Sequence, residues 1–298
     1  MEQIGLIGLG RMGQAMGARL RAAGFSLSVH NRTQAKADSL LAQGATWAES
    51  PAALVATSDM ILTILTDDAA VEQVYNGSVG LLSAELDGKL LIEMSTIRRS
   101  TILALVPEVV ARGGQMVDAP VSGTLQPARD GQLLVLAGGR AEDVARAMPV
   151  FDVLARRVAH LGPHGAGTTM KLALNMPMAI FWAGLAEAIA MGRQYGLDTA
   201  QMLAVYLDSP VALPALRAKA PLLLGEQAEV AFDVTGVRKD LIAMLATGLD
   251  AGVPMPTGAA ALGTFAAATA AGYGEQDMIQ VVEFVSDMVR KTGVAARG

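Results

Sequence analysis

The sequence predicts an α/β domain built on a doubly wound parallel sheet, followed by an all-α domain. Up to about residue 160, short apolar runs alternate with helical stretches, which is typical of a parallel sheet with helices on both faces. After Gly165-Ala166-Gly167 the strand-like alternation stops and helical patterns follow one another. We therefore expect two domains, residues 1–162 and residues 163–298, joined by a long continuous helix.

The strands of the first domain are expected where short apolar runs end at polar or glycine-rich turns. These runs are Ile4–Ile7, Leu27–Val29, Met60–Leu65, Leu90–Ile92, Met116–Asp118 and Leu133–Ala137. Helical periodicity between the runs predicts helices over Met12–Ala23, Gln34–Ala42, Arg99–Arg112 and Ala141–Leu154.

The second domain is expected to be helical throughout, with prolines between successive helices. The predicted helices are Met170–Tyr195, Thr199–Leu207, Ala212–Leu224, Gly236–Ala251, Gly258–Ala271 and Glu275–Lys291. Pro177 lacks an N–H group and should kink or locally open the first of them. The stretch Ala173–Met191 approaches the length of a membrane span, but Glu187 within it would be costly in lipid. We therefore expect a buried core helix there.

The composition excludes several classes of protein. The chain carries a net charge of −5 and no run of Lys or Arg, so a nucleic-acid partner is not expected. It contains no cysteine, which excludes disulfides and thiolate chemistry and fits a reducing compartment. The N-terminal segment lacks the basic region of a signal peptide, so we expect a cytoplasmic protein with no membrane partner. His30, His160 and His164 lack the spacing of metal ligands, and no metal site is expected.

A glycine-rich loop follows the first expected strand. The segment Gly8-Leu9-Gly10-Arg11-Met12-Gly13 matches the pattern G-x-G-x-x-G, with an apolar strand before it and a helix after it. In this setting the first glycine makes a tight turn, the second lets the backbone approach a pyrophosphate, and the third lets the helix pack on the strand. The helix N-terminus then offers N–H groups to phosphates. The loop therefore predicts a bound nicotinamide dinucleotide.

The end of the second strand bears on which dinucleotide binds. An enzyme that uses NAD places an acidic residue there for the ribose hydroxyls. This chain has His30-Asn31-Arg32-Thr33 instead, with no carboxylate at the turn. The Arg32 guanidinium suits a 2′-phosphate, and Asn31 and Thr33 can add hydrogen bonds. We expect NADP(H) to be preferred, with NAD(H) possible.

A lysine and an asparagine share one face of the long helix. Lys171 and Asn175 are four residues apart, and the glycines before them permit a close backbone approach. Buried lysines are rare unless they are paired, so Lys171 either extends to solvent or has a chemical task. A carbonyl that accepts a hydride becomes an alkoxide that needs a proton, and a buried ammonium group can supply it.

A hydroxyl-bearing turn follows the strand that ends at Asp118. Ligands of α/β sheets gather at the carboxyl ends of the strands. Ser122 and the backbone N–H groups around Gly123 could hold a substrate carboxylate there, although an ordinary serine turn has the same composition.

Five segments along the chain resemble the β-hydroxyacid dehydrogenase family, which includes 3-hydroxyisobutyrate dehydrogenase and tartronate semialdehyde reductase. They are GLGRMG at 8–13, MST at 94–96, DAPVSG at 118–123, GAGTTMKLALN at 165–175 and RKDL at 238–241. The stretch from Ser122 to Gly139 more closely resembles the glyoxylate and succinic semialdehyde reductase branch. Within it, Thr124 stands where many relatives have a second glycine.

The resemblance implies a Rossmann-type first domain and a role for each matching residue. Lys171 would be the catalytic acid and Asn175 would orient the substrate. Ser122, Gly123 and Thr124 would hold the substrate carboxylate. The cofactor would contact the turn at Leu65 and Thr66, Thr96 near its nicotinamide end, and Lys239, with Asp240 beside the substrate. Without the resemblance, Lys239 and Asp240 would be an ordinary exposed pair.

The main functional hypothesis is an NADPH-dependent reductase of small aldehyde acids, such as glyoxylate or succinic semialdehyde. A second is oxidation of a 3-hydroxy acid, such as 3-hydroxyisobutyrate or serine. Imine reduction on the same scaffold is a third, which Lys171 disfavours. A non-catalytic protein that binds NADPH is the alternative from another class. The apolar, charge-poor helical half suggests buried subunit contacts, and the family implies a homodimer or homotetramer.

Overall fold

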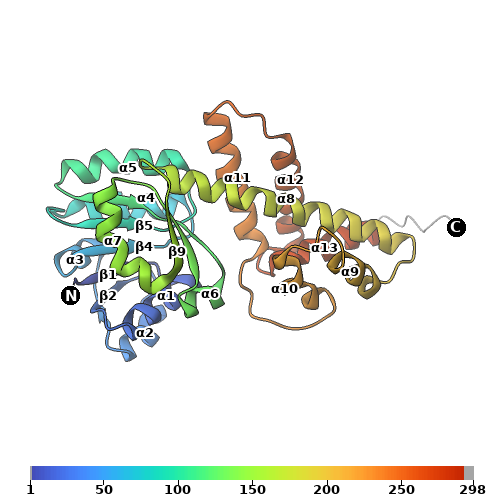
Figure 1. Ribbon diagram of the computed structural model, residues 1–298, viewed down its shortest axis with the longest axis horizontal. Coiled ribbons are helices and arrows are strands. Elements are labelled where there is room, and N and C mark those ends of the chain that lie inside the picture. Colours follow the sequence, from blue (N-terminus) through green and yellow to red (C-terminus); the bar gives the residue numbers. More distant parts are fainter. Residues whose placement is uncertain (1, 292–298) are drawn as a thin grey trace. The chain divides into compact units, whose positions relative to one another are not determined.

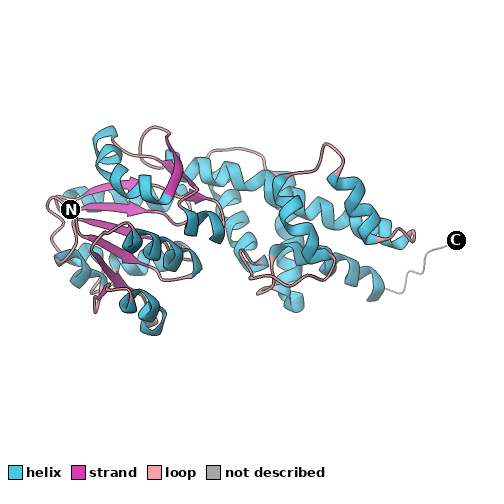
Figure 2. Ribbon diagram, turned by 60° about the horizontal axis from the view of Figure 1, so that its bottom comes forward, coloured by secondary structure: helices cyan, strands magenta, loops and turns pink. Residues whose placement is uncertain are grey.

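The computed structural model describes residues 2–291 of the chain. The residues divide into two compact units, and the division falls between Ala173 and Leu174, inside the long helix α8 (Ala166–Gln194) (Figure 1). Figure 2 shows all strands of the described residues in the first unit and helices with loops in the second. The mixed α/β and all-α parts that the sequence predicts are therefore confirmed.

The first unit is built on a parallel six-stranded sheet in the order β3-β2-β1-β4-β5-β6. The strands are β1 (Ile4–Ile7), β2 (Leu27–His30), β3 (Thr46–Trp47), β4 (Met60–Thr63), β5 (Leu90–Glu93) and β6 (Gln115–Asp118). The chain starts in the middle of the sheet, extends to β3, and returns past β1 to β4. This reversal is the arrangement in which α/β sheets bind ligands beyond the carboxyl ends of their strands.

Two apolar clusters cover the two faces of this sheet. Leu6 and Ile92 face one cluster, with residues of α1 (Arg11–Ala22) and α7 (Ala141–Leu154). Ile7 and Leu91, next to them in sequence, face the other, with residues from the helices on that side. Those helices are α3 (Pro51–Ala56), α4 (Asp68–Asn76) and α5 (Arg99–Ala111). Strands buried on both faces have no alternation of polar residues, which explains their continuous apolar sequences.

A second, three-stranded sheet corrects one expectation. The run Leu133–Ala137 forms strand β8, but β8 pairs antiparallel with β7 (Val121–Ser122) and parallel with β9 (Ala155–His160) instead of joining the main sheet. The short helix α6 (Leu125–Asp130) connects β7 to β8. An apolar run shows that a strand is buried but not which strand it pairs with.

Other parts of the first unit also differ from the prediction. The expected single helix over Gln34–Ala42 consists of a 3-10 turn, Gln34–Ala37, followed by the short helix α2 (Asp38–Ala42). The polar turn after β4 continues into α4, because the Asp67 side chain accepts a hydrogen bond from the Ala70 N–H and caps that helix.

The second unit is helical in its described part. Apart from an isolated bridge between Asp233 and Asp277, it contains no strand in residues 174–291. Its helices after α8 are α9 (Thr199–Leu207), α10 (Pro214–Leu223), α11 (Val234–Asp250), α12 (Pro256–Ala268) and α13 (Val281–Lys291). A buried ion pair joins Lys219 of α10 to Asp277, which precedes the 3-10 turn Met278–Gln280.

The helix α8 runs through Pro177 without interruption, so the local opening expected there does not occur. Its second half buries one face, including Trp182 and Ile189. Among the described residues α8 is also the helix whose length and apolar composition would suffice to cross a membrane, and about 39% of its most apolar window is buried. The interpretation as a core helix therefore holds for one face of α8 only.

Candidate active site

The glycine loop connects β1 to α1 with a geometry that only glycine permits at two positions. Gly8 has a φ of +98°, and a Cβ atom there would collide with the carbonyl oxygen of Ile64. A Cβ atom at Gly13 would collide with the carbonyl oxygen of Gly8. Beside Gly10, by contrast, a Cβ atom would meet nothing within 4 Å. Gly10 therefore borders open space at the N-terminus of α1, as the close approach of a pyrophosphate requires.

The end of β2 holds this loop in place. The Leu9 N–H donates to Asn31 Oδ1 at 2.9 Å, and Asn31 Nδ2 donates to the Thr33 carbonyl oxygen at 2.9 Å. Asn31 therefore ties the loop to the turn that the sequence assigns to the cofactor ribose. Arg32 and Thr33 are exposed beside it. Their contact with a 2′-phosphate stays a prediction, and the structure gives Asn31 a supporting task that the sequence did not suggest.

The turns after β4 and β5 are joined by a hydrogen bond. The Leu65 N–H donates to Ser95 Oγ at 2.7 Å, although the two residues are 30 positions apart. This bond brings the expected cofactor residues Leu65 and Thr66 beside the turn that contains Thr96. In the turn after β4, the carbonyl oxygen of Ile64 lies directly against Gly8. The structure thus groups three separate segments of the predicted cofactor site.

A buried carboxylate, which sequence analysis missed, lies beneath these turns. Glu93 is the last residue of β5 and is fully buried. Its Oε1 accepts from the Ser95 N–H at 2.8 Å, and its Oε2 accepts from Thr63 Oγ1 at 2.6 Å. The Tyr75 hydroxyl lies 3.3 Å from Thr63 Oγ1. Burial raises the pKa of Glu93 from 4.5 to about 7, against the hydrogen bonds, which lower it.

This pKa predicts how the stability of the protein changes with pH. Unfolded, Glu93 ionises near pH 4.5, whereas the folded protein holds the proton up to about pH 7. Between these values the folded state binds more protons, so the free energy of unfolding falls as pH rises. Relative to Glu93→Gln, which does not titrate, the wild-type protein should lose about 2.5 kcal/mol of its free energy of unfolding between about pH 5 and about pH 8.

Urea denaturation of both proteins at the two pH values measures this change. All other titrating groups are common to the two proteins and cancel in the difference. A difference in the free energy of unfolding that is the same at both pH values would show that Glu93 is already ionised in the folded protein at about pH 5.

A second buried carboxylate fastens the start of α8. Asp118, the last residue of β6, accepts from the Gly165 N–H at 2.7 Å and from the Thr168 N–H at 2.8 Å. Desolvation raises the pKa of Asp118, and the backbone hydrogen bonds oppose this rise. A Cβ atom at Gly167 would collide with the carbonyl oxygen of Leu136. The first turn of α8 is therefore fixed against the ends of β6 and β8.

Lys171 lies one turn after Gly167, on the same face of α8. Its exposed fraction is 9%, so it does not extend into solvent, and that alternative is wrong. The Asp118 contacts determine where this turn lies. Lys171 therefore belongs to the same unit as the glycine loop. Proteins rarely bury a lysine unless it is paired or has a task.

The Ser122–Thr124 turn follows the short strand β7. Gly123 has a φ of +134°, and a Cβ atom there would press on Leu133 and Pro127. Within residues 2–291, neither the Ser122 nor the Thr124 hydroxyl forms a hydrogen bond, and Thr124 precedes α6 without capping it. Both hydroxyls can therefore bind an external group. The prediction that this group is a carboxylate is not tested by the structure.

The second unit contributes a separate group of predicted residues. Asn175 Nδ2 donates to Asp240 Oδ2 at 3.0 Å, which links α8 to α11. Lys239 Nζ lies 2.6 Å from Asp240 Oδ1. Asp240 has an exposed fraction of 3%, so the interpretation of Lys239 and Asp240 as an ordinary exposed pair is wrong. The Asp240 carboxylate positions Asn175 and Lys239.

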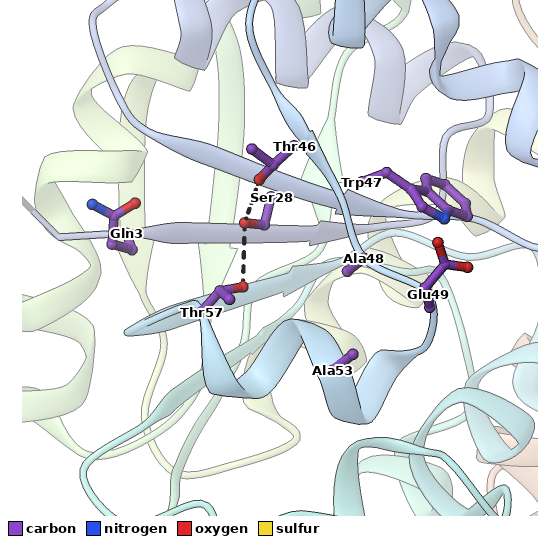
Figure 3. Close-up of a pocket in the computed structure, with 8 residues that line it drawn as sticks. All are labelled: Gln3, Ser28, Thr46, Trp47, Ala48, Glu49, Ala53 and Thr57. Carbon is purple, nitrogen blue, oxygen red and sulfur yellow. Dashed lines mark hydrogen bonds between the residues drawn. The ribbon is translucent and has the colours of Figure 1, made fainter.

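A pocket of about 470 Å³ lies at the β3 edge of the main sheet. Figure 3 shows its hydroxyl groups bonded to one another: Ser28 Oγ lies 2.9 Å from Thr46 Oγ1, and Thr57 donates to Ser28 at 3.3 Å. None of the predicted site residues lines this pocket. The described residues also contain no group of three or more potential metal ligands.

The fold and the glycine loop define a dinucleotide-binding protein, and family comparisons define its class. Residues 3–162 match the NAD-binding domain of 6-phosphogluconate dehydrogenase. Residues 165–285 match the NAD-binding domain of NADP-dependent 3-hydroxyisobutyrate dehydrogenase. The protein is therefore an NAD(P)-dependent oxidoreductase. It belongs to the β-hydroxyacid dehydrogenase family.

Individual relatives cover nearly the whole chain. Glyoxylate/succinic semialdehyde reductase 1 of Arabidopsis thaliana is 35% identical over 95% of this chain and 98% of its own length. The 3-hydroxyisobutyrate dehydrogenase of Salmonella typhimurium superposes with a TM-score of 0.86 at 26% identity, covering 95% of this chain and all of that one. Psf3, solved with NADP⁺ and 2-OPP, superposes with a TM-score of 0.84 at 29% identity, covering 95% of this chain and all of that one.

Proposed function

We propose that the protein is an NADPH-dependent reductase that converts small aldehyde acids, such as glyoxylate or succinic semialdehyde, to hydroxy acids. The observation that carries this proposal is the buried Lys171 on a helix turn that Asp118 fastens to the sheet. The similarity to the Arabidopsis glyoxylate/succinic semialdehyde reductase supports the substrate class.

The reaction assigns a task to each group of residues. A reduced nicotinamide, when bound, supplies the hydride to the aldehyde carbon. Ser122, Gly123 and Thr124 bind the carboxylate of the substrate with hydroxyl and backbone N–H groups. Lys171 Nζ donates a proton to the carbonyl oxygen as negative charge develops on it. Asn175, held by Asp240, orients the substrate.

The preference for NADP(H) rests on the turn after β2. Arg32 is exposed there, no acidic residue occupies the turn, and Asn31 fixes the turn against the glycine loop. The solved relative Psf3 contains NADP⁺. A relative in Pseudomonas aeruginosa, by contrast, is named an NAD-dependent L-serine dehydrogenase. NAD(H) therefore remains the alternative cofactor.

Oxidation of a 3-hydroxy acid is the competing activity. It is favoured by the 3-hydroxyisobutyrate dehydrogenase of Pseudomonas aeruginosa, which is 38% identical over 70% of this chain. The same Lys171 would then accept a proton from the hydroxyl group.

The homodimer or homotetramer stays a prediction. The second unit does expose apolar side chains, such as Tyr195 and Leu249, each with an exposed fraction of 79%.

A substrate panel tests the proposal. We expect kcat/KM for the reduction of glyoxylate or succinic semialdehyde to exceed kcat/KM for the oxidation of 3-hydroxyisobutyrate and serine by about tenfold or more. A tenfold ratio corresponds to a difference of about 1.4 kcal/mol in transition-state binding. Higher kcat/KM for a 3-hydroxy acid would establish the competing activity. Tight binding of NADPH without turnover of any of these substrates would contradict the proposed reductase activity and favour the non-catalytic alternative.

A further inference from the structure

Hydrogen bonds at the end of β5 connect the turns after β5 and β4, and the turn after β4 contacts the glycine loop. The Glu93 carboxylate accepts from the Ser95 N–H, and Ser95 Oγ in turn accepts from the Leu65 N–H at 2.7 Å. The segment that contains Leu65 begins with Ile64, whose carbonyl oxygen lies against Gly8. This chain of contacts therefore extends from a buried carboxylate, through the turns after β5 and β4, to the glycine loop.

The other oxygen of the Glu93 carboxylate is hydrogen-bonded as well. It accepts from Thr63 Oγ1 at 2.6 Å, and Tyr75 of α4 approaches the same hydroxyl. All members of this group are nearly or fully buried: Thr63, Tyr75, Glu93 and Ser95. Burial of a carboxylate without a cationic partner is unfavourable, and an apolar side chain would fill the site at lower cost. The arrangement therefore calls for an explanation beyond stability.

We propose that Glu93 and Ser95 are positioning residues that hold the turns after β4 and β5 in the arrangement that binds the nicotinamide half of the cofactor. The inference rests on the proposed placement of the cofactor over these turns. Glu93 contacts no ligand itself, because it lies beneath the turns. It acts by fixing the Ser95 backbone, and Ser95 transmits this restraint to Leu65.

The bonds predict which substitutions matter. Ser95→Ala removes the acceptor of the Leu65 N–H. Glu93→Met keeps the side-chain length but leaves the Ser95 N–H and the Thr63 hydroxyl without their acceptor. Glu93→Gln retains an oxygen for the Ser95 N–H and offers an N–H to Thr63 Oγ1, so it should preserve the arrangement. Ser28→Ala is the matched control, because Ser28 is a buried, hydrogen-bonded serine of the same sheet outside this chain of bonds.

The experiment measures the Kd of two ligands for the full-length protein and each variant. NADPH covers the whole site, whereas adenosine 2′,5′-bisphosphate carries only the half expected beside Arg32. Ser95→Ala loses one of these hydrogen bonds and Glu93→Met loses two, and each should weaken NADPH binding about tenfold or more, since an unsatisfied buried donor costs about 1–3 kcal/mol. They should change the Kd of adenosine 2′,5′-bisphosphate less than about twofold, since the turn after β2 is bonded through Asn31 instead.

Glu93→Gln and Ser28→Ala should bind both ligands as the wild-type protein does. Equal weakening of both ligands by Ser95→Ala and Glu93→Met, or unchanged binding of NADPH, would overturn the positioning role. If the wild-type protein binds neither of these ligands but binds NADH, the NADP(H) proposal fails. The positioning role is then judged in the same way with NADH and adenosine 5′-monophosphate.

Discussion

Lys171→Ala is expected to lower kcat for aldehyde-acid reduction by about 10²- to 10⁴-fold, the range typical of a lost general acid. Lys171 is buried on the turn of α8 that the Asp118 carboxylate holds through the Gly165 and Thr168 N–H groups. A water molecule in the space left by the lysine side chain would be a weaker and less well oriented proton donor than the ammonium group. The measurement is steady-state kinetics at saturating NADPH, with NADPH binding measured separately.

Lys89→Ala is the matched control for this substitution. Lys89 lies on the first unit as well, and its Nζ donates to the Ser58 carbonyl oxygen at 2.8 Å near the opposite ends of the strands. This variant should retain wild-type kcat. A Lys171→Ala protein that binds NADPH normally and keeps kcat within about threefold of the wild-type value would contradict the role of Lys171, because general acids contribute far more than that.

Arg32→Ala should raise KM for NADPH by about 10- to 100-fold and leave KM for NADH nearly unchanged, since hydrogen bonds to charged groups contribute about 1.5–3 kcal/mol. The reason is that only NADPH carries a 2′-phosphate for the exposed guanidinium at the end of β2. Kinetics with both cofactors and one saturating aldehyde acid measures the ratio.

Arg156→Ala serves as the control, because Arg156 is an exposed arginine of the same unit on the remote strand β9. It should alter neither KM. If Arg32→Ala raises both KM values equally, Arg32 supports the turn and does not recognise the phosphate.

Local signals explain which parts of the fold the sequence could predict. The strands β1, β4 and β5 are continuous apolar runs because two apolar clusters bury both of their faces. Strand β3 consists of Thr46 and Trp47 alone, which is too short to produce any periodicity. Strand β9 has the sequence ARRVAH with exposed arginines, and its pairing with β8 depends on contacts that no local pattern encodes.

The candidate site divides in the same way. The glycine loop is visible in the sequence because its requirements fall within a few residues: Gly8 has a positive φ, and a Cβ atom at Gly13 would collide with the carbonyl oxygen of Gly8. The carboxylates that hold the site are not visible, because their partners are distant in sequence. Asp118 bonds to an N–H group 47 residues away, and Glu93 bonds to a hydroxyl 30 residues away. A carboxylate that ends an apolar strand is the signal that could have identified both.

The rate of NADPH oxidation in the presence of succinic semialdehyde decides whether the protein reduces aldehyde acids. The purified protein is assayed with NADPH and, in parallel, with NADH at the same concentration. We expect turnover that depends on the aldehyde acid, with kcat/KM at least about tenfold higher for NADPH, given the charge-assisted bonds expected at Arg32. Failure to oxidise either cofactor in the presence of succinic semialdehyde or glyoxylate would overturn the proposed reductase activity.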